Sequence, residues 1–380
     1  MKDLSSQKDA GSIARRFVMP PFTLLDTRSG PWQERRRAWL EMGVHENLGR
    51  EENLLSDNLE MNALKSFHGS GTSMFDPVLT ECLVEWFCPQ RGHVLDPFAG
   101  GSVRGLISTF LGRAYTGIDL RAAQVMANEA QRKKVLPASA SMLQWVCADS
   151  DVALDILQPD LTADMILTCP PYADLEVYSN DVADLSVIAK KDHGAFLMKY
   201  QSILAKSARM LSQDRFFIIV VGEYRDKRGV YRNFVGETVA ALQSCGLDYY
   251  NEAILMQPAG TLPLRVGGYM TSSRKLGRCH QNVLVFVKGD PKAATQACLK
   301  DAPAELGYKG LPIVSKPKRG NTRRDIGVGV TVELKDEAPV GDGGMGVEDR
   351  SAVLTEAREL GGEGNGSGPV TGDHEGSQSG

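Results

Sequence analysis

The chain has 380 residues, of which 42% are hydrophobic, and it carries a formal net charge of −4 at pH 7. This composition supports a substantial core and excludes a fibrous or wholly disordered protein. No run approaches the roughly eighteen apolar residues of a membrane span, and the first residues lack the apolar core of a secretory signal. We therefore expect a cytoplasmic globular protein that does not contact a membrane.

The charge is unevenly distributed along the chain. Residues 331–380 contain 11 acidic and 3 basic residues, so the remaining residues are mildly basic despite the negative total. The seven cysteines show no CxxC pair and no Cys/His cluster with the spacing of zinc ligands. We expect reduced thiols and no metal site.

Four parts are predicted along the chain. Before residue 67, Pro20 and Pro21 open an extended segment at 19–26, and residues 32–40 form a basic helix that either faces solvent or contacts phosphate. The Gly-rich, acidic composition after residue 330 predicts disorder. The predicted parts are an N-terminal extension (1–66), a catalytic domain (67–290), a basic linker (291–330) and a disordered acidic tail (331–380).

The first strand ends in a glycine-rich turn. Asp76 is a natural N-cap for a helix that starts at Pro77, and Val94-Leu95 then reads as a short buried strand. The turn Asp96–Ser102 follows, and Ser102 is expected to cap a helix at 103–112. A strand, a glycine-rich turn and a helix in this order are typical of a nucleotide-type cofactor site.

Two further strands also end in acidic residues. Strand 114–120 contains Asp119, about 23 positions after Asp96, close to the spacing at which a second acid binds ribose hydroxyls in doubly wound folds. After a helix at 122–134, strand 143–148 is followed by Asp149. The carboxyl ends of parallel strands lie at one edge of a sheet, so these three acids should lie close together.

The fourth strand, 165–168, ends in a stiff corner, Cys169-Pro170-Pro171-Tyr172, which leads into a polar loop with Tyr178. An amphipathic helix at 196–211 and the most apolar strand, 216–222, come next. They are followed by a charged loop (223–232), a helix (234–245), a strand pair (249–256 and 282–288) and, between those strands, a basic glycine-rich loop (258–280).

This alternation predicts an α/β, Rossmann-like fold: a seven-stranded, mostly parallel sheet with one antiparallel strand and helices on both faces.

Two motifs of the chain resemble those of S-adenosylmethionine-dependent DNA methyltransferases that modify N6 of adenine or N4 of cytosine. The turn Asp96-Pro97-Phe98-Ala99-Gly100-Gly101-Ser102 resembles that family's cofactor motif, and Cys169-Pro170-Pro171-Tyr172 resembles its target-base tetrad. The similarity covers roughly residues 67–290, and the order of the motifs looks like the family's gamma arrangement. Residues 19–50, with the body that follows, also resemble methylases of phages and prophages, and the restriction-modification role that this suggests stays open because the sequence does not indicate a restriction partner.

The resemblance implies a cofactor, S-adenosylmethionine, a partner, DNA, and a site built from two sets of residues. The catalytic set is Cys169, Pro170, Pro171 and Tyr172. The cofactor set is Asp96, Phe98, Ala99, Gly100, Gly101, Asp119, Asp149, Ser73 and Phe75. Acceptors at residue 169 and at the Pro170 carbonyl would bind the amine hydrogens, and Tyr172 would stack on a base rotated out of the duplex.

The chain departs from the family's pattern at Cys169, where Asp, Asn or Ser is usual and a thiol is a weak hydrogen-bond partner. The target therefore stays open between cytosine N4 and adenine N6. A nucleophilic cysteine of the C5-cytosine type is disfavoured, because that family places its cysteine after the proline.

Target choice is expected to rest on loops, since the chain leaves little room for a separate recognition domain. The residues expected to contact nucleic acid are Tyr178, Arg265, Arg274, Lys275 and Arg278, although loop arginines can also be merely solvated. Two other functions stay open: methylation of RNA or of a protein amide, and a DNA-binding module that has lost catalysis. The sequence does not indicate an oligomeric state or the role of the N-terminal extension.

Overall fold

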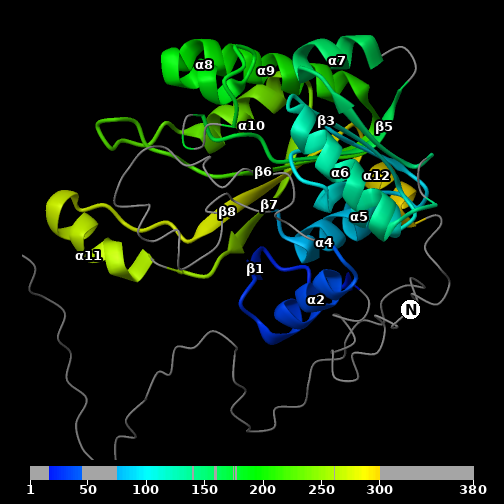
Figure 1. Ribbon diagram of the computed structural model, residues 1–380, viewed down its shortest axis with the longest axis horizontal. Coiled ribbons are helices and arrows are strands. Elements are labelled where there is room, and N and C mark those ends of the chain that lie inside the picture. Colours follow the sequence, from blue (N-terminus) through cyan, green and yellow to red (C-terminus); the bar gives the residue numbers. More distant parts are fainter. Residues whose placement is uncertain are drawn as a thin grey trace, which may run out of the picture. The chain divides into compact units, whose positions relative to one another are not determined.

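The computed structural model describes residues 17–44, 75–138, 141–157, 161–173, 175, 178–260 and 262–299. Within them, eight strands form one sheet (Figure 1). In sheet order the strands are β1 (Leu24–Asp26), β7 (Asp248–Met256), β8 (His280–Lys288), β6 (Leu211–Val221), β5 (Ala163–Thr168), β2 (His93–Asp96), β3 (Ala114–Asp119) and β4 (Leu143–Cys147).

Every strand pairing is parallel except the two made by β8, which runs antiparallel to both β6 and β7. The predicted α/β Rossmann-like sheet with one antiparallel strand is therefore confirmed. The predicted number of strands was wrong, because the N-terminal segment supplies an eighth. Leu24–Asp26 pairs with Ile254–Met256, and the Thr27 hydroxyl donates to the Met256 carbonyl at 2.7 Å. A strand of three residues is too short to leave a periodic signal.

Helices cover both faces of the sheet (Figure 1). One core cluster joins the sheet to α4 (Pro77–Phe87), α5 (Val103–Phe110) and α12 (Pro291–Leu299). The opposite cluster joins it to α7 (Ser150–Leu157), α9 (His193–Met210) and α10 (Phe234–Ser244). The remaining described helices are α2 (Gly30–Glu41), α6 (Ala122–Val135), α8 (Leu185–Lys191) and α11 (Leu262–Ser273).

Strand β6 shows why two helical layers are needed. Phe216, Ile218 and Val220 belong to the first cluster, whereas Phe217 and Ile219 belong to the second. Because successive side chains of a strand point to opposite faces, an uninterrupted apolar run has to be buried on both sides.

Helices occur at two places where the sequence predicted none. Helix α11 lies inside the predicted loop 258–280, and none of its residues is buried. Helix α12 begins directly after residue 290 and buries Ala294 against the sheet, so the described domain extends beyond 67–290 at both ends. Residues 301–380, which include the predicted tail, lie outside the described residues. No helix in the described part of the chain combines the length and the apolar character of a membrane span.

Candidate functional site

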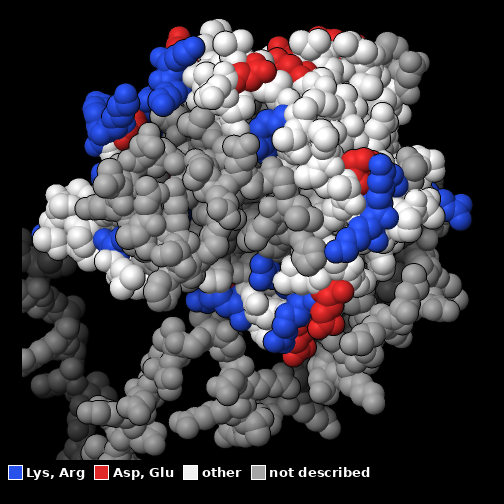
Figure 2. Space-filling view, in the orientation of Figure 1, with Lys and Arg blue, Asp and Glu red and all other residues white. Residues whose placement is uncertain are grey.

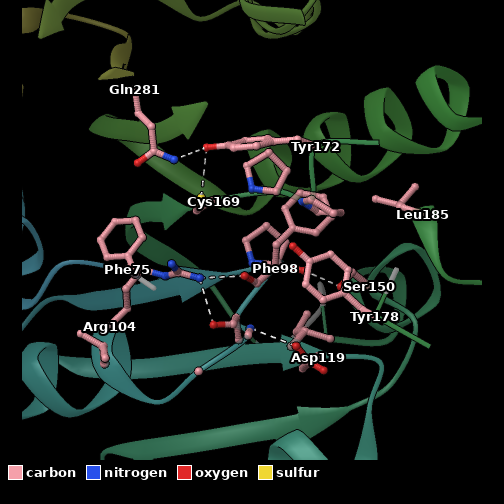
Figure 3. Close-up of a pocket in the computed structure, with 18 of the residues that line it drawn as sticks. Phe75, Phe98, Arg104, Asp119, Ser150, Cys169, Tyr172, Tyr178, Leu185 and Gln281 are labelled. Atoms are coloured by element: carbon pink, nitrogen blue, oxygen red, sulfur yellow. Dashed lines mark hydrogen bonds between the residues drawn. The ribbon is translucent and has the colours of Figure 1, made fainter. Parts of the chain in front are cut away.

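One cavity of about 510 Å³ lies at the carboxyl ends of β2, β3 and β5. It is lined both by the glycine-rich turn after β2 and by the Pro-Pro corner after β5, two segments about seventy residues apart in sequence (Figure 3). The sequence placed these two motifs at one site, and the fold brings them together. The volume falls within the roughly 300–1,000 Å³ that is usual for cofactor and small-molecule sites.

Two backbone amides of the glycine-rich turn donate hydrogen bonds to the end of β3. The Gly100 amide donates to Asp119 Oδ2 at 2.9 Å, and the Ala99 amide donates to the Ile118 carbonyl at 2.9 Å. Gly100 has a φ of +51°, which other residues adopt at a cost, and a Cβ placed on it would meet no atom within 4 Å. The cavity therefore reaches the backbone itself at this residue.

Asp96 holds the turn in place and does not line the cavity. Its buried carboxylate accepts four hydrogen bonds, from the Phe98 amide (3.1 Å), the Thr168 hydroxyl (2.7 Å), the Tyr115 hydroxyl (2.8 Å) and Arg104 Nε (2.5 Å). All of its acceptor positions are used within the protein, so this geometry does not support the expected direct contact between Asp96 and a cofactor. The residue instead ties β2, β3, β5 and α5 together beneath the turn.

Arg104 is the main residue of this side that the sequence analysis missed. It is 4% exposed and lines the cavity, with Nη2 donating to the Phe98 carbonyl at 2.7 Å and to the Ala99 carbonyl at 2.9 Å. The Phe75 ring covers it, with 4.4 Å from the ring centroid to the guanidinium carbon. Burial alone would lower the pKa of Arg104, but the Asp96 carboxylate outweighs it and raises that pKa. The available signal in the sequence was one charged residue, Arg104, in the otherwise uncharged segment that forms α5.

Asp119 and Asp149 both line the cavity, as the sequence predicted, but they are differently engaged. Asp119 accepts from the Gly100 amide and, at 2.8 Å, from the Arg121 amide, and burial raises the pKa of its carboxyl. Asp149 forms an ion pair with Lys199, whose Nζ lies 2.7 Å from Oδ2. Lys199 comes from α9 and was not foreseen as a residue of the cavity.

A buried polar face of α6 supports the turn from behind. Asn128 donates to the Gly100 carbonyl at 2.8 Å, and Gln124 donates to Asn128 at 2.9 Å. The expected capping role of Ser102 was wrong, because its side chain makes no capping bond and its hydroxyl donates to Gln131 instead. By contrast, Asp76 caps α4 as predicted, accepting from the amides of Val78 and Leu79.

The four corner residues Cys169–Tyr172 all line the cavity. Tyr172 is half-buried, and its ring meets Phe234 edge-on with 6.2 Å between centroids. Its hydroxyl accepts from Gln281 Nε2 at 2.7 Å and lies 3.7 Å from Cys169 Sγ (Figure 3). Burial raises the pKa of Tyr172, so the hydroxyl stays protonated at neutral pH. Gln281 comes from β8, and nothing in its local sequence marks it.

The residues expected to contact nucleic acid separate into two groups. Tyr178 lines the cavity, with the Arg121 guanidinium carbon 5.9 Å from its ring centroid. The basic residues of the 258–280 segment do not line the cavity. They are Arg265, on the exposed helix α11, and Arg274, Lys275 and Arg278, which follow it.

Two of these cations lie close to other parts of the site. The Lys275 side chain packs against Gly229 of the charged loop. Arg278 Nε donates to the His280 carbonyl at 2.9 Å and lies beside Gly222, which is also next to the Tyr172 ring. The Tyr172 side of the cavity thus lies next to this basic segment.

The N-terminal segment forms part of the cavity wall, which the sequence did not indicate. Thr27, Gln33 and Arg36 line it, and α2 is fastened to α4 by buried polar contacts. Trp32 Nε1 donates to Asp76 at 3.1 Å, and Trp39 donates to Glu81 at 2.8 Å.

Two further sequence expectations concern Ser73 and metals. Ser73, expected near the cofactor, lies outside the described residues, whereas Phe75 lines the cavity. Among the described residues, no group of three or more His, Cys, Asp or Glu side chains could hold a metal ion.

No protein-family model and no curated protein matches the chain. Solved methyltransferase structures match it distantly. TrmN from Thermus thermophilus has 17% identity over 56% of this chain and 49% of its own, with a TM-score of 0.36. A SAM-dependent methyltransferase from Agrobacterium tumefaciens has 16% identity over 56% and 61%, with a TM-score of 0.38.

A third match is the magnesium protoporphyrin IX methyltransferase of Synechocystis with bound SAM, which has 12% identity over 61% of this chain and 93% of its own, with a TM-score of 0.35. The aligned part of this chain spans about half of the TrmN chain. At such identities the matches concern the fold alone.

Proposed function

We propose that this protein transfers a methyl group from S-adenosylmethionine to an exocyclic amino group of a DNA base. The observation that carries the proposal is the single cavity lined by both the Phe98–Gly101 turn and the Cys169–Tyr172 corner. One motif fits a methyl donor and the other fits a flat acceptor, and methyl transfer requires both in one enclosure.

The cofactor side of the cavity has polar groups suited to the donor. Asp119 ends β3, at the position where ribose hydroxyls are bound in doubly wound folds. Asp149 follows β4, and its carboxylate can accept from an adenine amino group as well as from Lys199. The open backbone at Gly100 admits the methionine part of the donor. When bound, S-adenosylmethionine supplies an electrophilic methyl group on its sulfonium.

The opposite side of the cavity has the groups that an aromatic amine needs. The lone pair of such an amine is conjugated into its ring, so the enzyme has to orient the amine rather than deprotonate it first. The Pro170 carbonyl and Cys169 Sγ are acceptors for its hydrogens, and the two prolines hold that carbonyl rigidly. The Tyr172 ring offers a stacking face, and Gln281 fixes the tilt of that ring.

The choice of DNA rests on charge near the cavity. Figure 2 shows Lys and Arg side chains gathered over α8 and the 223–232 loop. The loop carries Arg225, Lys227, Arg228 and Arg232, and α8 ends in Lys190 and Lys191. Together with the cations after α11, these residues offer contacts for backbone phosphates.

The proposal is tested by incubating the full chain with methyl-labelled S-adenosylmethionine and equal amounts of duplex DNA, RNA or a protein mixture. We expect label in DNA, and we expect DNA binding to weaken steeply as salt rises. Tyr172→Ala should abolish most transfer, whereas Tyr172→Phe, which keeps the stacking ring, should lose only the roughly 2- to 10-fold expected for one neutral hydrogen bond. Label in RNA or protein alone would replace the proposed substrate, and cofactor binding without transfer to any of them would point to a module that has lost catalysis.

A further inference from the structure

Arg104 has one nitrogen that the fold leaves unused. Its Nε and Nη2 are committed to the Asp96 carboxylate and to the carbonyls of Phe98 and Ala99. Nη1 makes no hydrogen bond within the described residues, although the residue is 96% buried and lines the cavity. Nη1 is not among the buried side-chain atoms that lack a partner in the described part of the chain, so it is open to the cavity, where the acceptor of a ligand can reach it.

The position of this nitrogen is fixed by the groups around it. The Asp96 contact and the two carbonyl contacts hold the guanidinium plane, and the Phe75 ring covers it at 4.4 Å. The neighbouring Gly100 leaves its backbone open to the same cavity. An anionic group that binds Nη1 therefore lies against the glycine-rich turn and cannot shift far from it.

The other cations of the cavity are engaged elsewhere. Lys199 is paired with Asp149 and also donates to the Ala183 carbonyl at 2.7 Å. Arg121 lies at the end of β3, where its Nη2 donates to Gln124 at 2.7 Å and its guanidinium faces the Tyr178 ring. Arg36 comes from α2 on the N-terminal wall and makes contacts of its own.

We propose that Arg104 binds the α-carboxylate of the methyl donor through Nη1 and thereby selects a donor that carries a free amino acid end. This inference rests on the proposed function only in its choice of S-adenosylmethionine as the donor, and it is independent of the methyl acceptor. A carboxylate is the one anionic group of that molecule, and an arginine donor in a water-poor cavity binds it by a charge-assisted hydrogen bond. When the carboxylate is bound to Arg104, the length of the amino acid end sets the distance between the guanidinium and the two positive charges of the donor, its ammonium and its sulfonium.

The test compares two ligands and three forms of the full-length protein by isothermal titration calorimetry. The ligands are S-adenosylmethionine and its decarboxylated analogue, which keeps the adenosine and the sulfonium but lacks the carboxylate. Wild-type protein should bind the analogue on the order of 10- to 100-fold more weakly, as expected for the loss of one charge-assisted hydrogen bond. Arg104→Gln should weaken the binding of S-adenosylmethionine by a similar factor and should bind both ligands about equally.

Arg36→Gln tests a rival partner for the carboxylate, because Arg36 also lines the cavity, from α2 on the N-terminal wall. It should keep the wild-type preference for the carboxylate. Equal binding of the two ligands by wild-type protein would overturn the inference, as would loss of the preference in Arg36→Gln but not in Arg104→Gln. Thermal melting of each variant shows whether it is folded.

If Arg104→Gln does not fold, a crystal structure of wild-type protein with S-adenosylhomocysteine decides the matter. A carboxylate oxygen within about 3.2 Å of Nη1 supports the inference, and one that contacts another side chain instead contradicts it. These outcomes are separate from the proposed function. A protein that prefers the carboxylate but methylates no DNA would keep Arg104 in this role and lose the substrate.

Discussion

The two sides of the cavity are built in different ways. On the cofactor side, the turn is fixed by a dense set of buried hydrogen bonds centred on Asp96, and most of its residues come from the continuous segment 96–119. On the side of the Cys169–Tyr172 corner, which is proposed to face the base and is called the base side, the Tyr172 hydroxyl has hydrogen bonds with Gln281, more than a hundred residues away, and with Cys169, and its ring has contacts such as that with Phe234. The first side is locked by satisfied polar groups, and the second is held by a few contacts between distant segments.

This difference predicts where mutations affect folding and where they affect activity. Removing a buried charged side chain that makes all its hydrogen bonds leaves its partner as an uncompensated buried charge. A ring held by neutral hydrogen bonds alone can shift without loss of the fold. We therefore expect changes on the cofactor side to lower stability and changes on the base side to lower transfer rates in a folded protein.

The largest effect is expected for Asp96→Ala, which leaves the buried Arg104 guanidinium without its counter-ion. We expect the free energy of unfolding, measured by urea denaturation, to fall by about 3–5 kcal/mol. Asp155→Ala is the control, because that carboxylate pairs with Lys206 and Arg209 while 52% exposed, and such surface pairs contribute only about 0–1 kcal/mol. Equal losses in the two variants would break the contrast between the two sides.

Tyr172→Ala should lower the unfolding free energy by less than Asp96→Ala does, because the Tyr172 ring is only half-buried, while lowering kcat/KM on DNA by about 10- to 100-fold, which is the usual value of one base-stacking contact. Steady-state kinetics at saturating S-adenosylmethionine measure this change. A variant that is inactive because it is unfolded would place Tyr172 with the stabilising residues and remove the distinction.

The affinity for the cofactor should depend on pH through Asp119. Burial raises the pKa of this carboxyl above its ordinary value of 3.8, so the ionised form that accepts ribose hydroxyls is lost at a higher pH than for an exposed aspartate. The Kd for S-adenosylmethionine should therefore rise as the pH falls through that raised pKa. In Asp119→Asn this dependence should be absent, because an amide does not titrate. An identical pH profile in both proteins would exclude Asp119 from the contact.

A smaller effect is expected for Gln281→Leu, which removes the bond that fixes the Tyr172 hydroxyl. We expect a loss in kcat/KM of roughly 2- to 10-fold, corresponding to one neutral hydrogen bond. Tyr172→Phe removes the same bond, so the double variant should lose no more than either single variant. Additive losses would show that Gln281 acts through something other than this ring.

The smallest effect is expected for deletion of residues 331–380, whose Gly-rich and acidic composition cannot form a core. The melting temperature and kcat/KM of the shortened chain should equal those of the full chain. A marked drop in either would assign this segment a role that its composition does not suggest.

The sequence predicted the cofactor side better than the base side, and the reason is physical. Two consecutive strands end at Asp96 and Asp119, and Gly100 lies in the turn that follows the first of them. Spacing along the chain therefore corresponds directly to neighbouring positions at one edge of the sheet. The same local logic identified the Cys169–Tyr172 corner, whose two prolines mark a rigid turn.

The residues that the sequence did not reveal come from distant segments or have their partners there. Gln281 and Lys199 enter the cavity from β8 and α9 because of how the chain folds back, and nothing in their local pattern marks this. Strand β1 lies within the predicted extended segment 19–26, but its place in the sheet was missed because its partner β7 is more than two hundred residues away. Helix α11 was missed because its residues are all exposed or half-buried and its glycines favour a loop. The direct cofactor contact expected of Asp96 failed because the sequence did not show that Arg104 and Tyr115 would occupy its oxygens.

The account depends most on the claim that the two motifs serve one methyl transfer, and nucleoside analysis of methylated DNA tests it most directly. Duplex DNA is incubated with the full chain and labelled S-adenosylmethionine, digested, and separated by chromatography. We predict label in N6-methyladenine or N4-methylcytosine, most of it lost with Tyr172→Ala and a clearly larger share kept with Tyr172→Phe. Label in 5-methylcytosine, or transfer that survives Tyr172→Ala unchanged, would contradict the account.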